Sequence, residues 1–334
     1  MHEQLQSAHR NDADRALQDM VDYVDGFEVR SARAYEFAAR CLRAALARGL
    51  LALRDPDCGK HLGPVVPGAT LAHGARVPGT SFELDPVTAA FNIGVLLEPR
   101  RRGGDALPAE GGHPADNLGA ILAVADYRAR QAHNDGTLPL RVREVLTAMI
   151  KAHEIQGVIA ERNRFAPLGL DAVILVRVAS AAVATQLQAG SRAQILAAVS
   201  NAWLDGVSLH SVPDAASMGS RQLWAAADAS SRGVRHSLFA LAGEPGTASV
   251  LSAPRWGFYD ALFAGQAFRF ERAYGSHCIE NAAFARGEPA AFEAAVASHF
   301  AAKQADKIIA RFADPAALAA LPVNELLAAL VKNS

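Results

Sequence analysis

The sequence is poor in cysteine, and the few cysteines that it has are far apart. Cys41, Cys58 and Cys278 include no CxxC pair in a chain of 334 residues. This spacing argues against a disulfide framework and against a cysteine-ligated iron–sulfur cluster, and it is typical of a protein kept in a reducing compartment. We therefore expect a cytoplasmic protein without a cysteine-ligated iron–sulfur cluster.

Strong net charge and long apolar runs are also lacking. The formal net charge is only -1, so the chain has no bulk attraction to nucleic acid or to an anionic membrane. No apolar run approaches the ~20 residues that a bilayer-spanning helix needs. The first residues, Met1-His2-Glu3-Gln4, do not show the basic-then-apolar pattern of a signal peptide. We expect neither a nucleic-acid partner nor a membrane location.

Aromatic residues are scarce as well, at 7% of a chain that is 51% hydrophobic and rich in alanine. Alanine favours helices, whereas aromatic and β-branched residues favour strands. The long apolar segments repeat at helical spacing, and the length allows one large domain or two smaller ones. The sequence predicts an all-α fold with long loops. A short strand or extended segment is expected only at residues 266–274, where apolar and polar residues alternate.

Start signals place several of the expected helices. Ser31 caps one helix, Asp85-Pro86 begins another, and Ser191 with Gln194 forms a capping box. Residues 171–187 are apolar nearly all round, which indicates a helix at the centre of the domain. The remaining helices are expected at residues 16–24, from 118 onward, and at 140–158, 223–241, 289–312 and 315–331. Loops are expected at residues 55–84, 98–112 and 207–221.

A histidine in a tight turn is the best candidate for chemistry. It lies in the stretch Gly111-Gly112-His113-Pro114-Ala115-Asp116. Pro114 biases His113 away from helical angles, and Asp116 is well placed to cap the helix that follows. An imidazole beside a helix N-terminus is suited to bind a carboxylate and to move a proton. The alternative is that His113 only closes a surface turn, because a lone motif match is often a false positive.

A second stretch begins like a zinc site. His153-Glu154 matches the start of HExxH, but Gly157 stands where the second histidine is needed. Without that ligand pair the motif cannot hold zinc, and no metal site is predicted. His153 is then expected to be a helix residue packed under the loops.

Two further places could hold an anion. The loop Ser217–Gln222 offers hydroxyls, backbone amides and the guanidinium of Arg221, although it could equally be a plain connection between helices. Arg272 and Tyr274 could bind a carboxylate or simply anchor the extended segment. Local pattern alone leaves both alternatives open.

Taken together, stretches along most of the chain resemble the MmgE/PrpD family, which includes 2-methylcitrate dehydratases and cis-aconitate decarboxylases. The resemblance is long and collinear. The matching stretches are LGPVVPG (62–68), RVPGTSFELDPVTAAFNIG (76–94), GHPADNLGAILAVADY (112–127), VLTAMIKAHEIQGVIA (145–160), GLDAVILVRVAS (169–180), AVSNAWLDGVSL (198–209), SRQLWAAADASSR (220–232), WGFYDALF (256–263), RAYGSHCIEN (272–281) and PVNELL (322–327).

The resemblance implies a hydro-lyase that works without a metal or cluster. It would remove water from 2-methylcitrate to give 2-methyl-cis-aconitate, in propionate breakdown by the methylcitrate cycle. This chemistry needs a base, an acid and cations that hold a tricarboxylate. Matching positions assign His113 as catalytic and Asp116, Arg221, Arg272 and Tyr274 as substrate-binding. The resemblance also implies a homodimer.

The family's helical domain is built from both ends of the chain, with an α+β lid inserted between them. Here residues 1–281 resemble the N-terminal part and residues 288–334 resemble the terminal helices. The lid, on the order of 150 residues and thus a domain in size, is absent between them. We therefore predict that residues 1–334 form a single helical domain without a lid.

Individual positions depart from the family too. The acidic segment expected before the histidine turn reads Arg100-Arg101-Arg102-Gly103-Gly104-Asp105. Gln222 replaces a lysine, Ala172 a histidine and His277 a tyrosine. Two functions therefore compete: a working 2-methylcitrate dehydratase, and a catalytically inactive, lid-less helical remnant that acts at most as a dimerising scaffold.

Overall fold

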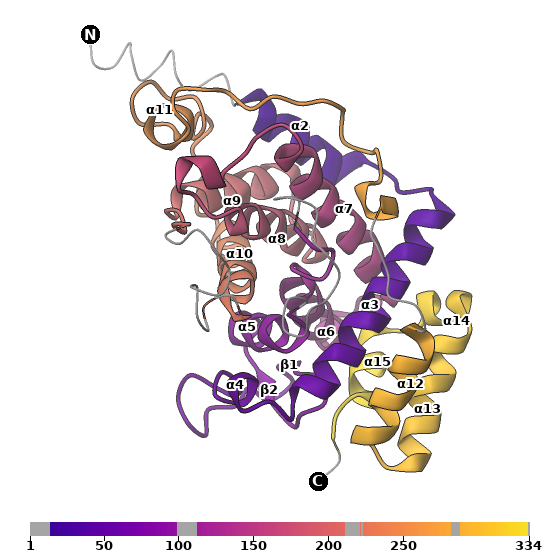
Figure 1. Cartoon of the computed structure of the whole chain (residues 1–334). Coiled ribbons are helices and arrows are strands. Elements are labelled where there is room, and N and C mark those ends of the chain that lie inside the picture. Colours follow the sequence, from indigo (N-terminus) through magenta and orange to yellow (C-terminus); the bar gives the residue numbers. More distant parts are fainter. Residues whose placement is uncertain (1–13, 99–111, 211–220, 222, 282–287, 333–334) are drawn as a thin grey trace.

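The computed structural model describes residues 14–98, 112–210, 221, 223–281 and 288–332, and most of these lie in helices (Figure 1). The all-α prediction is confirmed. The α-helices are α2 (Arg15–Gly26), α3 (Ala32–Ala52), α4 (Pro56–Gly59), α5 (Pro86–Leu97), α6 (Leu118–Asp135), α7 (Val142–Ala160), α8 (Val173–Leu187), α9 (Arg192–Leu204), α10 (Ala225–Leu241), α11 (Phe258–Leu262), α12 (Glu288–His299), α13 (Ala302–Ala313), α14 (Pro315–Ala320) and α15 (Val323–Ala329).

Helix α8 lies at the centre, as its uniformly apolar sequence predicts. It packs against α7, α9 and α10, and nearly all of its residues are buried (Figure 1). The predicted caps are also confirmed. Ser31 accepts a hydrogen bond from the N–H of Ala34, Asp85 accepts two from the first turn of α5, and Ser191 forms a reciprocal capping box with Gln194.

Glycine lets three helices approach each other closely. A Cβ atom on Gly94 of α5 would lie 2.7 Å from the Cβ of Ala227 on α10, and one on Gly119 of α6 would overlap the carbonyl oxygen of Ala90 on α5. Such a packed interface cannot take an extra methyl group without moving the backbone. These contacts hold the N-terminal end of α6 firmly against α5.

Residues 266–274, where the sequence allows a short strand or an extended segment, form no strand. Among the described residues, the one sheet has two short antiparallel strands, β1 (Ala75–Arg76) and β2 (Glu83–Leu84). Residues 266–270 are irregular, and bends and a turn follow at residues 271–274. The side chain of Asn163 takes the place of a partner strand there, because its amide donates to the carbonyl of Arg269 and accepts from the Arg269 N–H, both at 2.8 Å.

The C-terminal segment contains four helices where the sequence predicts two. Pro322 divides the predicted helix at 315–331, since a residue before proline avoids helical angles and Leu321 is extended. These helices pack on the rest of the chain: α12 lies along α3, α14 against α7 and α15 against α6 (Figure 1). Their apolar residues, including Phe292, Ile308 and Leu326, belong to the same hydrophobic core as α8.

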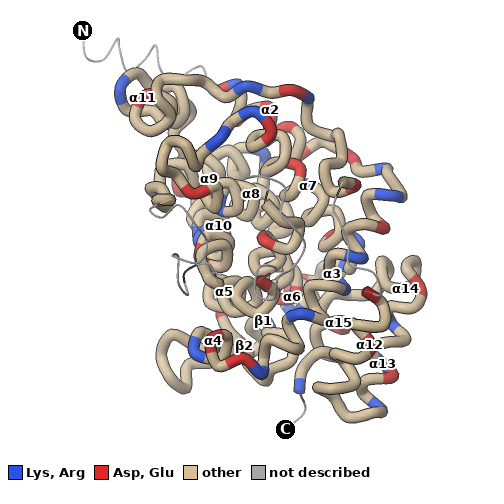
Figure 2. The backbone as a smooth tube through the Cα atoms, in the orientation of Figure 1, with Lys and Arg blue, Asp and Glu red and all other residues tan. Residues whose placement is uncertain are grey.

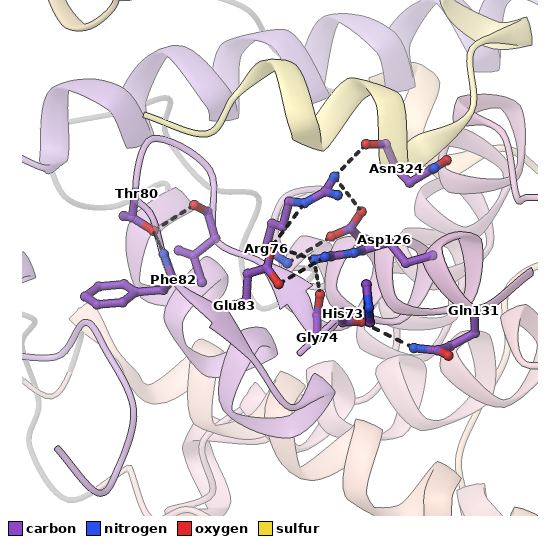
Figure 3. A network of polar contacts seen from close by, with 11 residues as sticks. His73, Gly74, Arg76, Thr80, Phe82, Glu83, Asp126, Gln131 and Asn324 are labelled. Carbon is purple, nitrogen blue, oxygen red and sulfur yellow. Dashed lines mark hydrogen bonds and ion pairs between the residues drawn. The ribbon is translucent and has the colours of Figure 1, made fainter. Parts of the chain in front are cut away.

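A buried polar network fastens β1 and α6 to α15 (Figure 3). Arg76 of β1 donates from Nη1 to the carbonyl oxygen of Asn324 at 2.7 Å, and its backbone N–H donates to Asp126 Oδ2 on α6 at 2.9 Å. Asp126 is fully buried, and this burial raises its pKa to about 6 even though Arg76 lies nearby. Arg130 of α6 binds Glu83 of β2 at 3.0 Å beside this cluster.

Charged residues of both signs are interspersed along the tube in Figure 2, and neither sign gathers on one side in this view. Among the helices of the described residues, none combines the length and the apolar character that crossing a membrane requires.

Candidate functional site

The histidine turn predicted from the sequence is a compact unit, which we call the HP turn (residues 112–117). The backbone N–H of His113 donates to Asp116 Oδ2 at 2.7 Å, and the backbone N–H of Asp116 donates back to the carbonyl of His113 at 2.9 Å. Asp116 is 3% exposed. Helix α6 begins at Leu118, so Asn117 occupies its N-cap position. The prediction that Asp116 caps this helix was wrong by one residue, because the Asp116 carboxylate binds the backbone of His113 instead. The structure therefore brings His113 and Asp116 together.

A third bond fixes the chemical form of the His113 ring. The backbone N–H of Ala115 donates to His113 Nδ1 at 3.0 Å. A backbone N–H can only donate, so Nδ1 must be the unprotonated nitrogen. The neutral ring then carries its proton on Nε2, because the hydrogen bond at one nitrogen sets the tautomer. His113, which is partly exposed, is in this form a proton donor through Nε2.

Helix α7 supports the HP turn from beneath. His153 is only 7% exposed, and its ring hydrogen-bonds the backbone of Gly112. Burial lowers the pKa of His153 to about 4, so this ring is neutral near pH 7. The expectation that His153 is packed under the loops is confirmed. The sequence did not show that the turn it supports is the one that contains His113.

Gln156 and Asn117 complete this support. The side-chain amide of Gln156 donates to Asn117 Oδ1, and Asn117 in turn donates to the carbonyl of Val176 at 2.9 Å and to Ser180 Oγ at 2.8 Å. Gly112 has a φ of +71°, and any Cβ there would overlap the Gln156 side chain. Both facts require glycine at this position.

Arg272 and Tyr274 lie in a different place from the HP turn. With α2 residues they line a cavity of about 720 Å³, and none of the described residues that line it comes from the HP turn. Arg272 holds Glu161 through two hydrogen bonds of 2.5 and 2.7 Å, and this pairing raises the pKa of Arg272. Tyr274 stacks on Tyr23 at 5.3 Å, and burial raises its pKa.

The charge of this cavity does not favour a tricarboxylate in the arrangement seen. Asp19, Asp22 and Glu271 line it together with Arg15 and Arg272. Because Arg272 is already paired with Glu161, the cavity's carboxylates outnumber its available positive charge. A substrate carboxylate would therefore have to displace Glu161 from Arg272 in order to bind there.

The other predicted positions are placed as follows. Arg221 lies just before α10, with its guanidinium 4.8 Å from the centre of the Trp224 ring. Ala172 directly precedes α8, and His277 has a φ of +58°. Gln222 and the stretch Arg100–Asp105 lie outside the described residues. Within the part of the chain that the structure describes, no three His, Cys, Asp or Glu side chains gather as metal ligands would.

Comparison with known proteins decides the family. Residues 18–271, which include the HP turn, match the MmgE/PrpD N-terminal domain. The chain belongs to the MmgE/PrpD family. Its match to this family confirms the resemblance read from the sequence motifs, and the helical fold agrees with it.

Several curated MmgE/PrpD relatives share much of the sequence. The chain is 53% identical to the 2-methylcitrate dehydratase of Cupriavidus necator over 291 residues, which are 87% of this chain and 60% of that protein. It is 51% identical to the 2-methylcitrate dehydratase of Escherichia coli K12 over 288 residues, with shares of 86% and 60%. The mitochondrial 2-methylcitrate dehydratase of Yarrowia lipolytica is 44% identical over 290 residues, with shares of 86% and 56%. The matches thus span about 60% of the length of these relatives.

Proposed function

We propose that this protein is a 2-methylcitrate dehydratase, a hydro-lyase that converts 2-methylcitrate to 2-methyl-cis-aconitate in the methylcitrate cycle. The observation that carries the proposal is the identity of 51–53% to proteins that bear this name, joined to a well-formed HP turn within the region that matches the family. The substrate is a small tricarboxylate, and no cofactor is needed.

The geometry of the HP turn supports a specific role for His113. Loss of water breaks a C–O bond and a neighbouring C–H bond while a C=C bond forms. The leaving hydroxyl needs a proton, and His113 carries one on Nε2 because Nδ1 is engaged by Ala115. We assign His113 as the acid that stabilises this hydroxyl through an Nε2–H hydrogen bond as it leaves, while a separate base takes the carbon-bound proton that completes the water molecule. Asp116, which holds the backbone of His113, keeps the ring in place.

Arg221, Arg272 and Tyr274 are the proposed ligands of the substrate carboxylates, together with Asp116 as a polar contact. In this proposal Arg272 exchanges Glu161 for a substrate carboxylate, since a guanidinium binds either anion through the same paired donors.

We further propose that residues 1–334 form a single helical domain of a cytoplasmic homodimer. Residues 288–334 take the part of the family's terminal helices, which agrees with their packing on α3, α6 and α7. Alanine-rich helices with few aromatic residues need broad flat faces to bury, and association through such faces favours a dimer. Light scattering at micromolar concentration tests this: a dimeric mass is expected, and a monomeric mass contradicts it.

The function is tested with purified protein and 2-methylcitrate. Formation of the unsaturated product, followed by NMR, is the expected result. No product from a chain whose circular dichroism shows the helical fold would favour the competing hypothesis, a catalytically inactive scaffold. That hypothesis draws on the matches spanning about 60% of the length of the relatives, and on the sequence departures at residues 100–105 and at Gln222.

A further inference from the structure

The carboxylate of Glu154 on α7 binds a single loop, residues 272–278. Its Oε1 accepts hydrogen bonds from the N–H of Gly275 at 2.9 Å and from the N–H and hydroxyl of Ser276 at 2.6 and 2.7 Å. Its Oε2 accepts one from the N–H of Cys278 at 2.6 Å. Glu154 is completely buried. Four donors from one loop therefore replace the water that this charge would otherwise bind.

A carboxylate is the side chain that fits this set of donors. Both of its oxygens accept here, one from Gly275 and Ser276 and the other from Cys278. The amide of glutamine has one oxygen and one NH₂ group, so its NH₂ would face a backbone N–H donor in either orientation. An apolar residue would leave every one of these donors unsatisfied in the interior. The carboxylate of Glu154 therefore satisfies the hydrogen-bond donors of the loop that it binds.

The loop needs such an anchor because its backbone is not relaxed. Gly275 has a φ of +97° and His277 a φ of +58°, and the second value lies in a region that residues with side chains rarely adopt. Such angles persist only where the surroundings over-determine them. The residues bonded to Glu154 lie on both sides of His277.

We propose that Glu154 is a positioning residue, which fixes the loop of Arg272 and Tyr274 against α7. The same helical turn also holds the HP turn, through the bond of His153 to Gly112 and that of Gln156 to Asn117. Three residues within one turn of α7 (His153, Glu154 and Gln156) thus set the relative position of the two loops that carry the candidate site. The part of this proposal that concerns substrate rests on the proposed function, whereas the anchoring of the loop does not.

Cys278 provides a reporter that does not depend on catalysis. Its thiol is 7% exposed, and burial raises its pKa to about 12, so it should react slowly with a maleimide. Cys41 and Cys58 are buried elsewhere, at 1% and 0% exposure, and serve as internal controls for the fold. Labelling of each cysteine is measured by peptide mass spectrometry on the full chain.

In Glu154→Gln, we expect labelling of Cys278 to accelerate by roughly tenfold or more, since hydrogen bonds to a charged group are lost. Cys41 and Cys58 should stay protected. Glu144→Gln is the matched control, because Glu144 is also on α7 but bonds only the start of its own helix. An unchanged rate at Cys278 in Glu154→Gln would overturn the proposal.

If all three cysteines become reactive in Glu154→Gln, the variant has lost its fold. The same labelling experiment on Ser276→Ala then tests whether Glu154 anchors the loop. This substitution removes one of the four donors and leaves the carboxylate in place. Selective acceleration at Cys278 supports the anchor, and no acceleration overturns it.

Kinetics then separate positioning from mere stability. In an active chain we expect Glu154→Gln to raise KM for 2-methylcitrate by roughly tenfold with a smaller change in kcat, and an unchanged KM overturns the positioning role. If the parent chain shows no turnover, the proposed function has failed, while the labelling result still decides whether Glu154 anchors the loop.

Discussion

The backbone N–H of Ala115 donates to Nδ1 of His113 at 3.0 Å, and this single bond determines which end of the imidazole can give up a proton. We predict that neutral His113 is protonated at Nε2. Two-dimensional ¹⁵N–¹H NMR of ¹⁵N-labelled protein above the pKa of the ring measures this directly. The His113 resonance is identified by its loss in His113→Asn. A neutral ring protonated at Nδ1 would contradict the assignment of His113 as the acid.

Asp126 should make stability depend on pH in a mildly acidic window. Burial raises its pKa from 3.8 to about 6 in the folded state, so between these values the folded protein binds the proton more tightly than the unfolded chain. The contribution of the protonated Asp126 side chain to the free energy of unfolding is fully present below pH 3.8 and is lost as the pH rises through 6. The shift corresponds to about 3 kcal/mol.

The measurement is urea unfolding from pH 3.5 to 7, and Asp126→Asn isolates the effect. Asparagine keeps an oxygen that accepts from the Arg76 N–H but cannot ionise. The free energy of unfolding of the parent, relative to that of the variant, should fall as the pH rises through this window. Asp306→Asn, at an exposed position, is the control: it keeps Asp126, so its free energy of unfolding should change with pH as that of the parent does. Parallel pH profiles for the parent and Asp126→Asn would refute the prediction.

Glu161 should compete with substrate for Arg272. Both side chains are about one-third exposed, and such ion pairs contribute roughly 0–1 kcal/mol. Glu161→Gln should therefore leave stability nearly unchanged while it improves the affinity for 2-methylcitrate by up to about fivefold. Titration calorimetry measures the affinity. Glu28→Gln, whose glutamate pairs with Arg30 and is not among the residues that line the cavity, is the matched control. No gain in Glu161→Gln would remove Arg272 from the proposed ligands.

The approach of α6 to α5 predicts a severe effect from one methyl group. Gly119→Ala would place a Cβ against the carbonyl of Ala90, and we expect it to destabilise the protein by roughly 1–3 kcal/mol. Gly26→Ala is the control, because apart from its chain neighbours and its own helix backbone no atom of the described residues lies within 4 Å of the added Cβ at the end of α2. Alanine is the better helix former there, so this variant should be neutral or slightly more stable. Equal unfolding temperatures for the two variants would contradict the close packing described above.

Local signals in the sequence predicted the helices well, because caps and apolar stripes act over a few residues. Ser31, Asp85 and Ser191 each cap the helix that was expected of them. One failure was local, since Pro322 divides the helix predicted at residues 315–331. The other involves a distant partner. Asn163 satisfies the backbone of Arg269 across 106 residues, and no pattern within residues 266–274 reveals that this segment has a side chain in place of a neighbouring strand.

In the candidate site, too, the sequence predicted the local feature but not the contacts between distant residues. The sequence located the turn of His113 and Asp116 because its residues are adjacent in the chain. It did not reveal that α7 supports this turn. In the sequence, His153 and Glu154 resemble an incomplete zinc motif, and only the structure shows that they bind the backbone of two loops. Nor did the sequence show that Arg272 is held by Glu161, a partner 111 residues away.

Turnover of 2-methylcitrate by the parent chain and by His113→Asn, measured side by side, tests the central claim most directly. Asparagine offers its Oδ1 to the N–H of Ala115 in place of His113 Nδ1, so the HP turn should persist without the acid. We predict measurable water loss in the parent and a fall of about 10²–10⁴-fold in kcat for the variant. Equal rates in two folded proteins would contradict the account, as would a parent chain that is folded and yields no 2-methyl-cis-aconitate.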